Sequence, residues 1–252
     1  MSSRTPVYDA IGGHYQDAKA LPSALVERAT VLAACGDVVG LEVLDLACGT
    51  GFYTRLLRDR GARTQGVDVS AAMVDTARGI EETAPLGIDY HVHDATDLPH
   101  LGDFGLITGV WLLNYATDET VLTSMLQSIR RNLAPGGSFV GVTQNPAFDF
   151  AGPPSTKYGW TFEPLTDSDF GTQVYATAHT TPPIQFPAVF TRAEVYSRCA
   201  RAAGLGEFEW FPLVLDQTAR DRFGTGFWHD FQANPYLAAF GCRPAGAGQE
   251  AR

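Results

Sequence analysis

The chain has 252 residues, of which 45% are hydrophobic, and it carries a formal net charge of −10. This length is sufficient for one domain with a full hydrophobic core, or for one domain with a lid. The only lysines are Lys19 and Lys157 and the arginines are scattered, so the basic patch that binds nucleic acids or anionic membranes is not expected.

The first forty residues are predicted to be helical. Val7, Ile11 and Tyr15 recur at helical spacing, although a pair of glycines interrupts them. A second helical segment, 24–35, has an apolar side and ends at a glycine. Both segments precede the stretch around which the rest of the chain is organised.

Residues 43–54 form this stretch, with the sequence V-L-D-L-A-C-G-T-G-F-Y-T. They predict a buried strand, a glycine turn and then a helix whose N-terminus faces a ligand. Gly49 and Gly51 let the backbone turn tightly and let a nucleotide-like cofactor come close. The third glycine of the dinucleotide fingerprint is missing, because Thr54 occupies its place. The carboxylate of Asp45 instead suits a cofactor with a free ammonium group, bound directly or through water.

The stretch resembles motif I, D-x-x-x-G-x-G, of the class I S-adenosylmethionine (SAM) methyltransferases. The resemblance implies that the turn binds SAM, and the residues we assign to it are Asp45, Ala47, Gly49 and Gly51. It also implies that residues 1–40 fold over the cofactor as a lid and that Tyr15, or else Tyr8, contacts it. The alternatives are a strand-turn-helix without a ligand and plain core packing of both tyrosines.

The second predicted strand, 64–68, ends at Asp68. In a doubly wound sheet the ligand lies beyond the carboxyl ends of the strands. A carboxylate at that position can accept hydrogen bonds from both hydroxyl groups of a ribose. The resembled family uses an acidic residue here in that way, so Asp68 is the predicted ribose anchor.

The third predicted strand, 88–93, is followed directly by Asp94 and Ala95. The resemblance implies that Asp94 lies against the adenine amino group, with Asp97 as the alternative, and Ala95 is assigned to the cofactor beside it. Met73, in the first turn of the preceding helix, is expected to pack on adenine with its polarizable side chain, with core packing as the alternative. The two histidines of the strand share one face, but without a third partner they do not predict a metal site.

The fourth predicted strand, 104–109, runs into the turn V-W-L-L-N-Y. In the resembled enzymes this turn lies beside the methylthio end of the cofactor. We therefore assign Val110 to the cofactor and predict that Trp111, Asn114 and Tyr115 line the methyl-transfer chamber. Core packing is the alternative for Trp111.

The remaining elements follow the order typical of class I methyltransferases. A helix and an A-P-G-G turn precede a fifth strand at 138–143, and two further strands are predicted at 207–215 and 236–242. We therefore predict a doubly wound, Rossmann-like α/β fold with a seven-stranded sheet whose last strand is antiparallel. The SAM-binding domain is expected to span 41–244, and residues 245–252 are expected to form a disordered tail.

Residues 145–190 break this alternation of strands and helices. Two short strands are predicted there, at 158–162 and 173–179, as a small antiparallel insertion. A long insertion in a compact domain is usually a lid or a binding element, and its many aromatic residues suit an apolar or aromatic small substrate. Additional substrate-binding candidates from this region and from nearer the C-terminus are Tyr158, Trp160 and Trp228.

His179 and His229 are the candidate general bases, because histidine titrates near neutral pH and both lie in predicted lid segments. Tyr158 or Asp230 could assist them. A surface or structural role is the alternative for each histidine, and some class I methyltransferases need no base at all. No metal ion is expected, because the sequence holds no cluster of metal ligands.

The predicted function is transfer of a methyl group from SAM to an oxygen or nitrogen of a small aromatic or heterocyclic metabolite, with S-adenosylhomocysteine (SAH) as the product. Four looser motifs, Y-D-x-I-G-G, W-L-L-N-Y-A, Y-G-W-T and F-W-x-x-F-x-x-N-P, resemble small bacterial secondary-metabolite methyltransferases of the toxoflavin-biosynthesis type. The alternatives are C-methylation of a small metabolite and a SAM-binding protein without catalytic activity. A nucleic-acid methyltransferase is disfavoured by the charge.

The four cysteines are far apart and form no C-x-x-C pair, which indicates reduced thiols. No apolar run is long enough to cross a membrane, and the N-terminus lacks the apolar core of a secretory signal. We therefore expect a cytoplasmic protein, monomeric or homodimeric, whose partner is a small-molecule substrate rather than a nucleic acid or a membrane.

Overall fold

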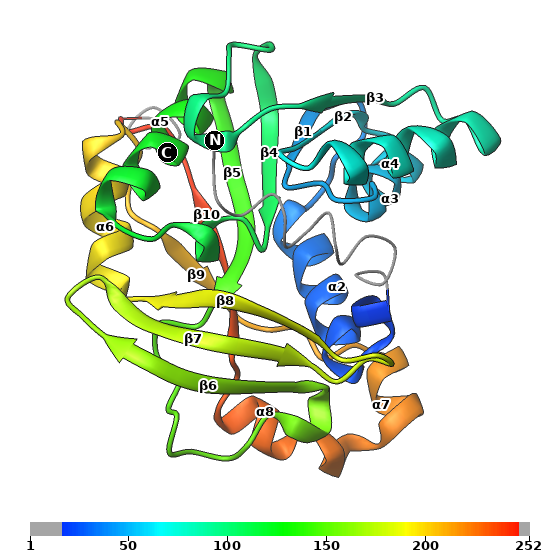
Figure 1. The fold of residues 1–252 in the computed structure, drawn as a ribbon. Coiled ribbons are helices and arrows are strands. Elements are labelled where there is room, and N and C mark those ends of the chain that lie inside the picture. The colour runs from blue at the N-terminus through cyan, green and yellow to red at the C-terminus, as the bar shows by residue number, and fades with distance from the viewer. Residues whose placement is uncertain (1–16, 247–252) are drawn as a thin grey trace.

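The computed structural model describes residues 17–246, which form two β-sheets and the helices around them (Figure 1). The larger sheet has the strand order β3-β2-β1-β4-β5-β10-β9. Its strands are β1 (Glu42–Leu46), β2 (Arg63–Asp68), β3 (Asp89–Val92), β4 (Phe104–Val110), β5 (Leu133–Gln144), β9 (Glu209–Phe211) and β10 (Leu237–Cys242). Strands β1 to β5 are parallel, and β10 lies antiparallel between β5 and β9. The predicted seven-stranded α/β sheet with an antiparallel last strand is confirmed.

Helices cover both faces of the larger sheet. Successive side chains of a strand point to opposite faces, so Phe139 packs with Leu126 under α5 and α6, while Val140 packs with Leu57 on the side of α2 and α3. The α-helices are α2 (Pro22–Cys35), α3 (Phe52–Asp59), α4 (Ala71–Thr83), α5 (Glu119–Asn132), α6 (Ala193–Ala202), α7 (Gln217–Phe223) and α8 (His229–Ala233). The short 3-10 helices are η2 (Ala95–Asp97), η3 (Leu113–Tyr115), η4 (Thr156–Tyr158) and η5 (Thr225–Trp228). None of the described helices is both long and apolar enough to cross a lipid bilayer.

The order of the strands places a crevice at the centre of the larger sheet. From β1 the chain builds outward through β2 to β3, and it then returns to the other side of β1 to add β4 and β5. The connections that follow β1 and β4 therefore leave the sheet in opposite directions. In doubly wound sheets such a switch point, beyond the carboxyl ends of the strands, is the usual ligand site.

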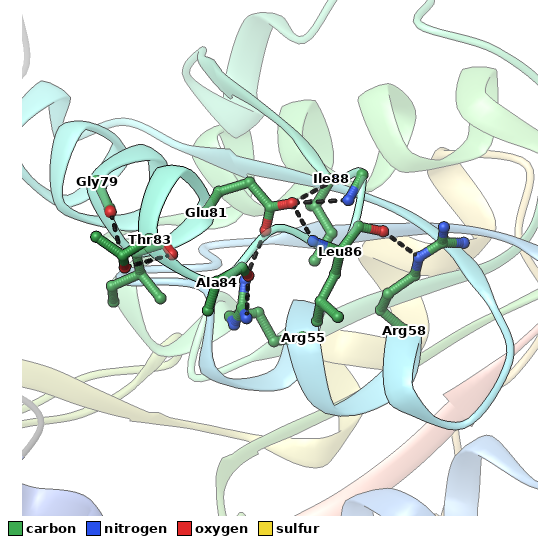
Figure 2. A network of polar contacts seen from close by, with 10 residues as sticks. Arg55, Arg58, Gly79, Glu81, Thr83, Ala84, Leu86 and Ile88 are labelled. Atoms are coloured by element: carbon green, nitrogen blue, oxygen red, sulfur yellow. Dashed lines mark hydrogen bonds and ion pairs between the residues drawn. The ribbon is translucent and has the colours of Figure 1, made fainter.

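A polar network fixes the outer part of this sheet, where α4 returns to β3 (Figure 2). Glu81 Oε1 accepts hydrogen bonds from the backbone N–H groups of Leu86, Gly87 and Ile88, at 2.5, 2.7 and 3.2 Å. Its other oxygen, Oε2, pairs with Arg55 of α3 at 2.6 Å. One carboxylate thus accepts the hydrogen bonds of three N–H groups in the loop before β3 and ties this loop to α3, which holds the start of β3 in place.

The smaller sheet consists of three antiparallel strands in the order β6-β7-β8. They are β6 (Trp160–Asp167), β7 (Gly171–Ala178) and β8 (Ile184–Thr191). Strand β8 contacts η3 and β5, and Figure 1 shows the small sheet lying across the ends of β4 and β5. Two of the strands were predicted and β8 was not, because Pro187 interrupts its sequence. Since β8 is an edge strand paired only with β7, a missing backbone N–H is tolerated there.

Candidate active site

A cavity of about 500 Å³ lies beyond the carboxyl ends of β1 to β4, at the switch point of the sheet. This volume is within the usual range for small-molecule and cofactor sites. Eighteen residues from these strand ends, from η3 and from the helices beside them line the cavity. They are Leu46, Ala47, Gly49, Val67, Asp68, Val69, Met73, His93, Asp94, Ala95, Thr96, Val110, Trp111, Leu112, Tyr115, Thr117, Val121 and Met125.

Asp68 connects the ends of β1 and β2 in the wall of this cavity. Its Oδ2 accepts a hydrogen bond from the backbone N–H of Gly49 at 2.8 Å, and its Oδ1 accepts one from that of Ser70 at 2.9 Å. The two donors come from the turns after β1 and after β2. They fix the orientation of the carboxylate, so a strong acceptor faces the cavity in a set position.

The two glycines of the turn have different roles. Gly49 has φ +55° and lines the cavity, and a Cβ added to it would have no atom within 4 Å. Gly51 has φ +86°, and a Cβ there would lie 2.4 Å from the hydroxyl oxygen of Tyr90. Both positions favour glycine for their backbone conformation. Only Gly49, however, leaves open space toward the cavity, and Gly51 is packed against β3.

Asp45 lies behind the turn rather than in the cavity wall. It is 2% exposed, and its oxygens accept hydrogen bonds from the hydroxyls of Thr54 and Thr108, at 2.6 and 2.7 Å. Burial raises the pKa of Asp45 to about 6, although these two hydrogen bonds act to lower it. In the described residues this carboxylate joins β1 to α3 and β4, so any contact with a cofactor would be indirect.

The substitution Asp45→Asn is expected to flatten the pH dependence of stability. Between about pH 4 and pH 6 the folded protein keeps a proton that the unfolded chain, with the usual pKa of 3.8, has released. Stability therefore falls as the pH rises, by about 3 kcal/mol in total from below the unfolded-state pKa to above the folded-state pKa, and by about 2 kcal/mol of this between pH 4 and pH 6. Urea unfolding of both proteins at pH 4.5 and pH 7 measures the difference. Equal pH slopes for wild type and Asp45→Asn would contradict the prediction.

Unlike Asp45 and Gly51, the remaining predicted cofactor residues within 17–246 lie in the cavity wall. Met73, Ala95 and Val110 line it from α4, η2 and β4. Asp94 lines it as well, and its Oδ1 accepts hydrogen bonds from the backbone N–H and the hydroxyl of Thr96, each at 2.8 Å. Tyr15 and Tyr8 lie outside the described residues. Their assignment to the cofactor stays a prediction.

A second, much smaller cavity of about 10 Å³ adjoins the first and shares Trp111 and Tyr115 with it. Its lining also includes the predicted residues Asn114 and Trp160. The sequence reasoning did not select the other four lining residues, which are Gln144, Phe162, Phe186 and Tyr236. Gln144 ends β5, so the signal that selected Asp68, a polar residue at a strand end, was also present there.

Trp111 connects helix α2 to both cavities. Its φ is +62°, a conformation that residues other than glycine rarely adopt. Its indole Nε1 donates a hydrogen bond to Glu27 of α2 at 2.7 Å, and the same carboxylate accepts one from the Tyr53 hydroxyl at 2.7 Å and pairs with Lys19. The buried Glu27, which sequence reasoning missed, thereby fixes the position of the Trp111 ring at the junction of the cavities.

Four predicted site residues lie away from both cavities. His179 is exposed and its Nε2 contacts the Thr161 hydroxyl at 2.7 Å, and His229 is exposed at the start of α8. Tyr158 is buried, and its hydroxyl donates to the carbonyl of Phe227 and accepts from a backbone N–H of α8. Trp228 is also buried and its ring stacks on Tyr158. The geometry does not favour a direct catalytic or substrate-binding role for any of them.

No group of three or more histidine, cysteine, aspartate or glutamate side chains could hold a metal ion within residues 17–246. The four cysteines have free thiols.

Comparison with known proteins shows that this chain is similar to a methyltransferase family model and to individual methyltransferases. A family model described as a methyltransferase domain matches residues 43–137. The ubiquinone biosynthesis O-methyltransferase of Xanthomonas oryzae pv. oryzae is 30% identical over 122 residues, which cover 47% of this chain and 49% of that protein. The ubiquinone/menaquinone biosynthesis C-methyltransferase of Desulfotalea psychrophila is 34% identical over 146 residues, covering 56% and 57%. The chain thus matches about half the length of these curated relatives.

Similar solved structures cover nearly the whole chain. DhpI in complex with SAH aligns with a TM-score of 0.60 and 19% identity over 96% of this chain and 95% of that one. The CcbJ methyltransferase from Streptomyces caelestis aligns with a TM-score of 0.58 and 20% identity over 96% of each chain. At these identities the likeness concerns the fold, and it extends beyond the segment that the family model matches.

Proposed function

We propose that the chain, whose residues 43–137 match a methyltransferase domain, transfers a methyl group from SAM to an oxygen or nitrogen of a small aromatic or heterocyclic molecule. The observation that carries the proposal is the cavity at the switch point, with a fixed carboxylate at the end of β2 and an aromatic wall after β4. The resemblance to toxoflavin-type enzymes stays a prediction and does not contribute to it.

The chemistry of the cavity wall suits SAM. Asp68 ends β2 and Asp94 follows the adjacent strand β3, and they offer carboxylate acceptors for the ribose hydroxyls and the adenine amino group respectively. Beside Gly49 the wall is open, so the backbone can lie close to a ligand. When bound, SAM supplies a methyl group that its sulfonium sulfur makes electrophilic. We assign Asp68, Asp94, Gly49 and Met73 to holding it.

The protein's own contribution to the reaction is alignment and exclusion of water. Trp111 and Tyr115 stand between the two cavities, so a flat substrate packed against them is held beside the cofactor space. Among the residues described, no aspartate, glutamate, histidine, lysine or arginine lines the smaller cavity. The smaller cavity therefore offers no such base to the substrate, which favours a nucleophile that needs none, such as a phenolate or a neutral nitrogen with a lone pair. The carboxylates of Asp68 and Asp94 and the imidazole of His93 line the larger cavity only.

C-methylation is the second candidate, because the Desulfotalea psychrophila relative is named as a C-methyltransferase and the O-methyltransferase relatives match a similar share of the chain. An activated carbon of an electron-rich ring needs the same alignment with the methyl group. Mass spectrometry with fragmentation of the methylated product distinguishes carbon from oxygen and nitrogen as acceptors.

Calorimetric titration of the wild-type protein with SAM and SAH is the test of the cofactor. We expect binding of both in the micromolar range. Turnover is then measured as SAH formed from SAM in the presence of phenols and N-heterocycles. Absence of binding to well-folded protein would overturn the proposal, whereas binding without turnover across these acceptor classes would favour a SAM-binding protein without transfer activity.

A further inference from the structure

Two buried side-chain amides in the wall of the smaller cavity have polar atoms without a hydrogen-bond partner in the described part of the chain. Asn114 is 1% exposed, and neither its Oδ1 nor its Nδ2 has a hydrogen-bond partner among residues 17–246. Gln144 is 3% exposed, and within the same described part of the chain its Oε1 has no partner either. Buried polar groups in folded proteins are nearly always hydrogen-bonded, so a group from outside this part of the chain is expected to pair with these amides.

The two amides are carried by backbone elements that line the cavity. Asn114 is the middle residue of η3, which begins two residues after the left-handed Trp111. Gln144 is the last residue of β5 and pairs with Leu237 of β10 in the larger sheet. Their amide groups are therefore presented from a sheet end and a tight turn rather than from a loop.

The rest of the smaller cavity is aromatic and carries no formal charge in the described residues. The ring of Trp111 stacks on Tyr236 at 6.3 Å between centroids, and Phe186 packs against Tyr115 at 6.4 Å and against Trp160 at 5.9 Å. Such a wall favours a flat, uncharged ring, because a charged group would lose its hydration without gaining a counter-ion.

We propose that Asn114 and Gln144 recognise the substrate by one edge, and that this edge belongs to a neutral planar heterocycle with an N–H donor directly beside a C=O acceptor, as in a lactam. The proposal rests on the function proposed above. A carboxamide offers a donor and an acceptor side by side, so Asn114 can pair with both groups of such an edge, whichever way its amide is turned. Gln144 supplies a further polar atom to the same edge.

The sizes of the two cavities agree with this arrangement. The smaller cavity has room for about one water-sized group, so the carbonyl oxygen of the edge fills it and the adjacent N–H lies at its mouth. The body of the ring then lies in the larger cavity between Trp111 and Tyr115, and its methyl-accepting atom faces the cofactor space. The competing explanation is a single bound water that bridges the two amides. A substrate that displaces this water must make equivalent hydrogen bonds to Asn114 and Gln144.

The test uses the wild-type protein saturated with SAH and ligand-observed NMR titrations with three small probes. 2-Pyridone has adjacent N–H and C=O groups, 4-pyridone has them at opposite ends of the ring, and N-methyl-2-pyridone lacks the donor. We expect 2-pyridone to bind at least about tenfold more tightly than either of the others, as expected when a buried polar group would otherwise stay unpaired. Equal affinities, or no binding of 2-pyridone, would overturn the proposal.

Apolar replacements of similar size identify the residues responsible. In Asn114→Leu and Gln144→Met we expect the preference for 2-pyridone to disappear, with unchanged SAH affinity and an unchanged or raised Tm. The matched control is Gln127→Met, an exposed residue of α5, which should keep the preference. A lowered Tm with the preference retained would indicate a structural water and overturn the proposal. Failure of SAH to bind wild type, recorded before any pyridone is added, would instead refute the function itself.

Discussion

Replacing Asp68 by alanine is expected to weaken binding of SAM and SAH by about 100-fold or more. A hydrogen bond to a charged group contributes about 1.5–3 kcal/mol, and the two hydroxyls of a ribose would each donate one to this carboxylate. The variant also loses the acceptors for the Gly49 and Ser70 N–H groups, which loosens the turns that form the cavity wall. Calorimetric titration measures the affinity, and thermal unfolding shows whether the variant is folded.

The matched control for this substitution is Asp97→Ala. Asp97 is exposed and ends η2, outside the lining of the cavity, so its removal changes the net charge equally without touching the site. We expect this control to bind SAH as wild type does. If a folded Asp68→Ala protein binds SAM with wild-type affinity, Asp68 is not the ribose anchor, and the cofactor site must be sought elsewhere in the cavity.

Substitution of the two turn glycines by alanine is expected to separate folding from binding. Gly51→Ala should destabilise the protein by about 2–5 kcal/mol, since a left-handed alanine costs about 1–2 kcal/mol and overpacking about 1–3 kcal/mol. Gly49→Ala should cost only the backbone part, about 1–2 kcal/mol, because its Cβ meets no protein atom. That Cβ would enter the space where the ligand approaches, so Gly49→Ala should lose SAH affinity instead.

Urea unfolding and SAH titration of both variants measure these two effects. The Tyr90→Phe background provides an internal check, because it removes the hydroxyl oxygen that lies 2.4 Å from the added Cβ, while the ring carbon at 2.9 Å stays. Gly51→Ala should therefore be less damaging in Tyr90→Phe than in wild type. Equal unfolding free energies for Gly49→Ala and Gly51→Ala would show that packing against Tyr90 is not what requires the second glycine.

The fold followed from local signals that the sequence carries directly. A buried strand, a glycine turn and an amphipathic helix depend on residues close together in the chain, and the polar residues that end β2 and β3 are visible as a change from apolar to acidic. These signals, together with the resemblance carried by residues 43–54, predicted a doubly wound seven-stranded sheet, its ligand edge and acidic residues at the ends of two strands. The dependence on local signals also explains the missed strand β8, whose local signal Pro187 breaks.

Other properties of the site depend on contacts between distant segments of the chain. The sequence alone did not determine these properties. The motif predicts that Gly51 contacts the cofactor, yet Tyr90 of β3 occupies the space beside it. Tyr158 was predicted to bind the substrate, yet both hydrogen bonds of its hydroxyl go to backbone groups in and beside α8. Asn114 and Gln144 are thirty residues apart, and only the pairing of β4 with β5 places them around one cavity.

The physical reason is the same for all of these residues. Secondary structure arises from periodic burial and short-range sterics, which a single sequence displays, and the handedness of the connections restricts how parallel strands can be arranged. Whether a polar or aromatic side chain faces a cavity or the core depends on what packs against it from elsewhere in the chain. For this protein the sequence determined the sheet and its ligand edge, and the tertiary structure decided which side chains are left to face the ligand.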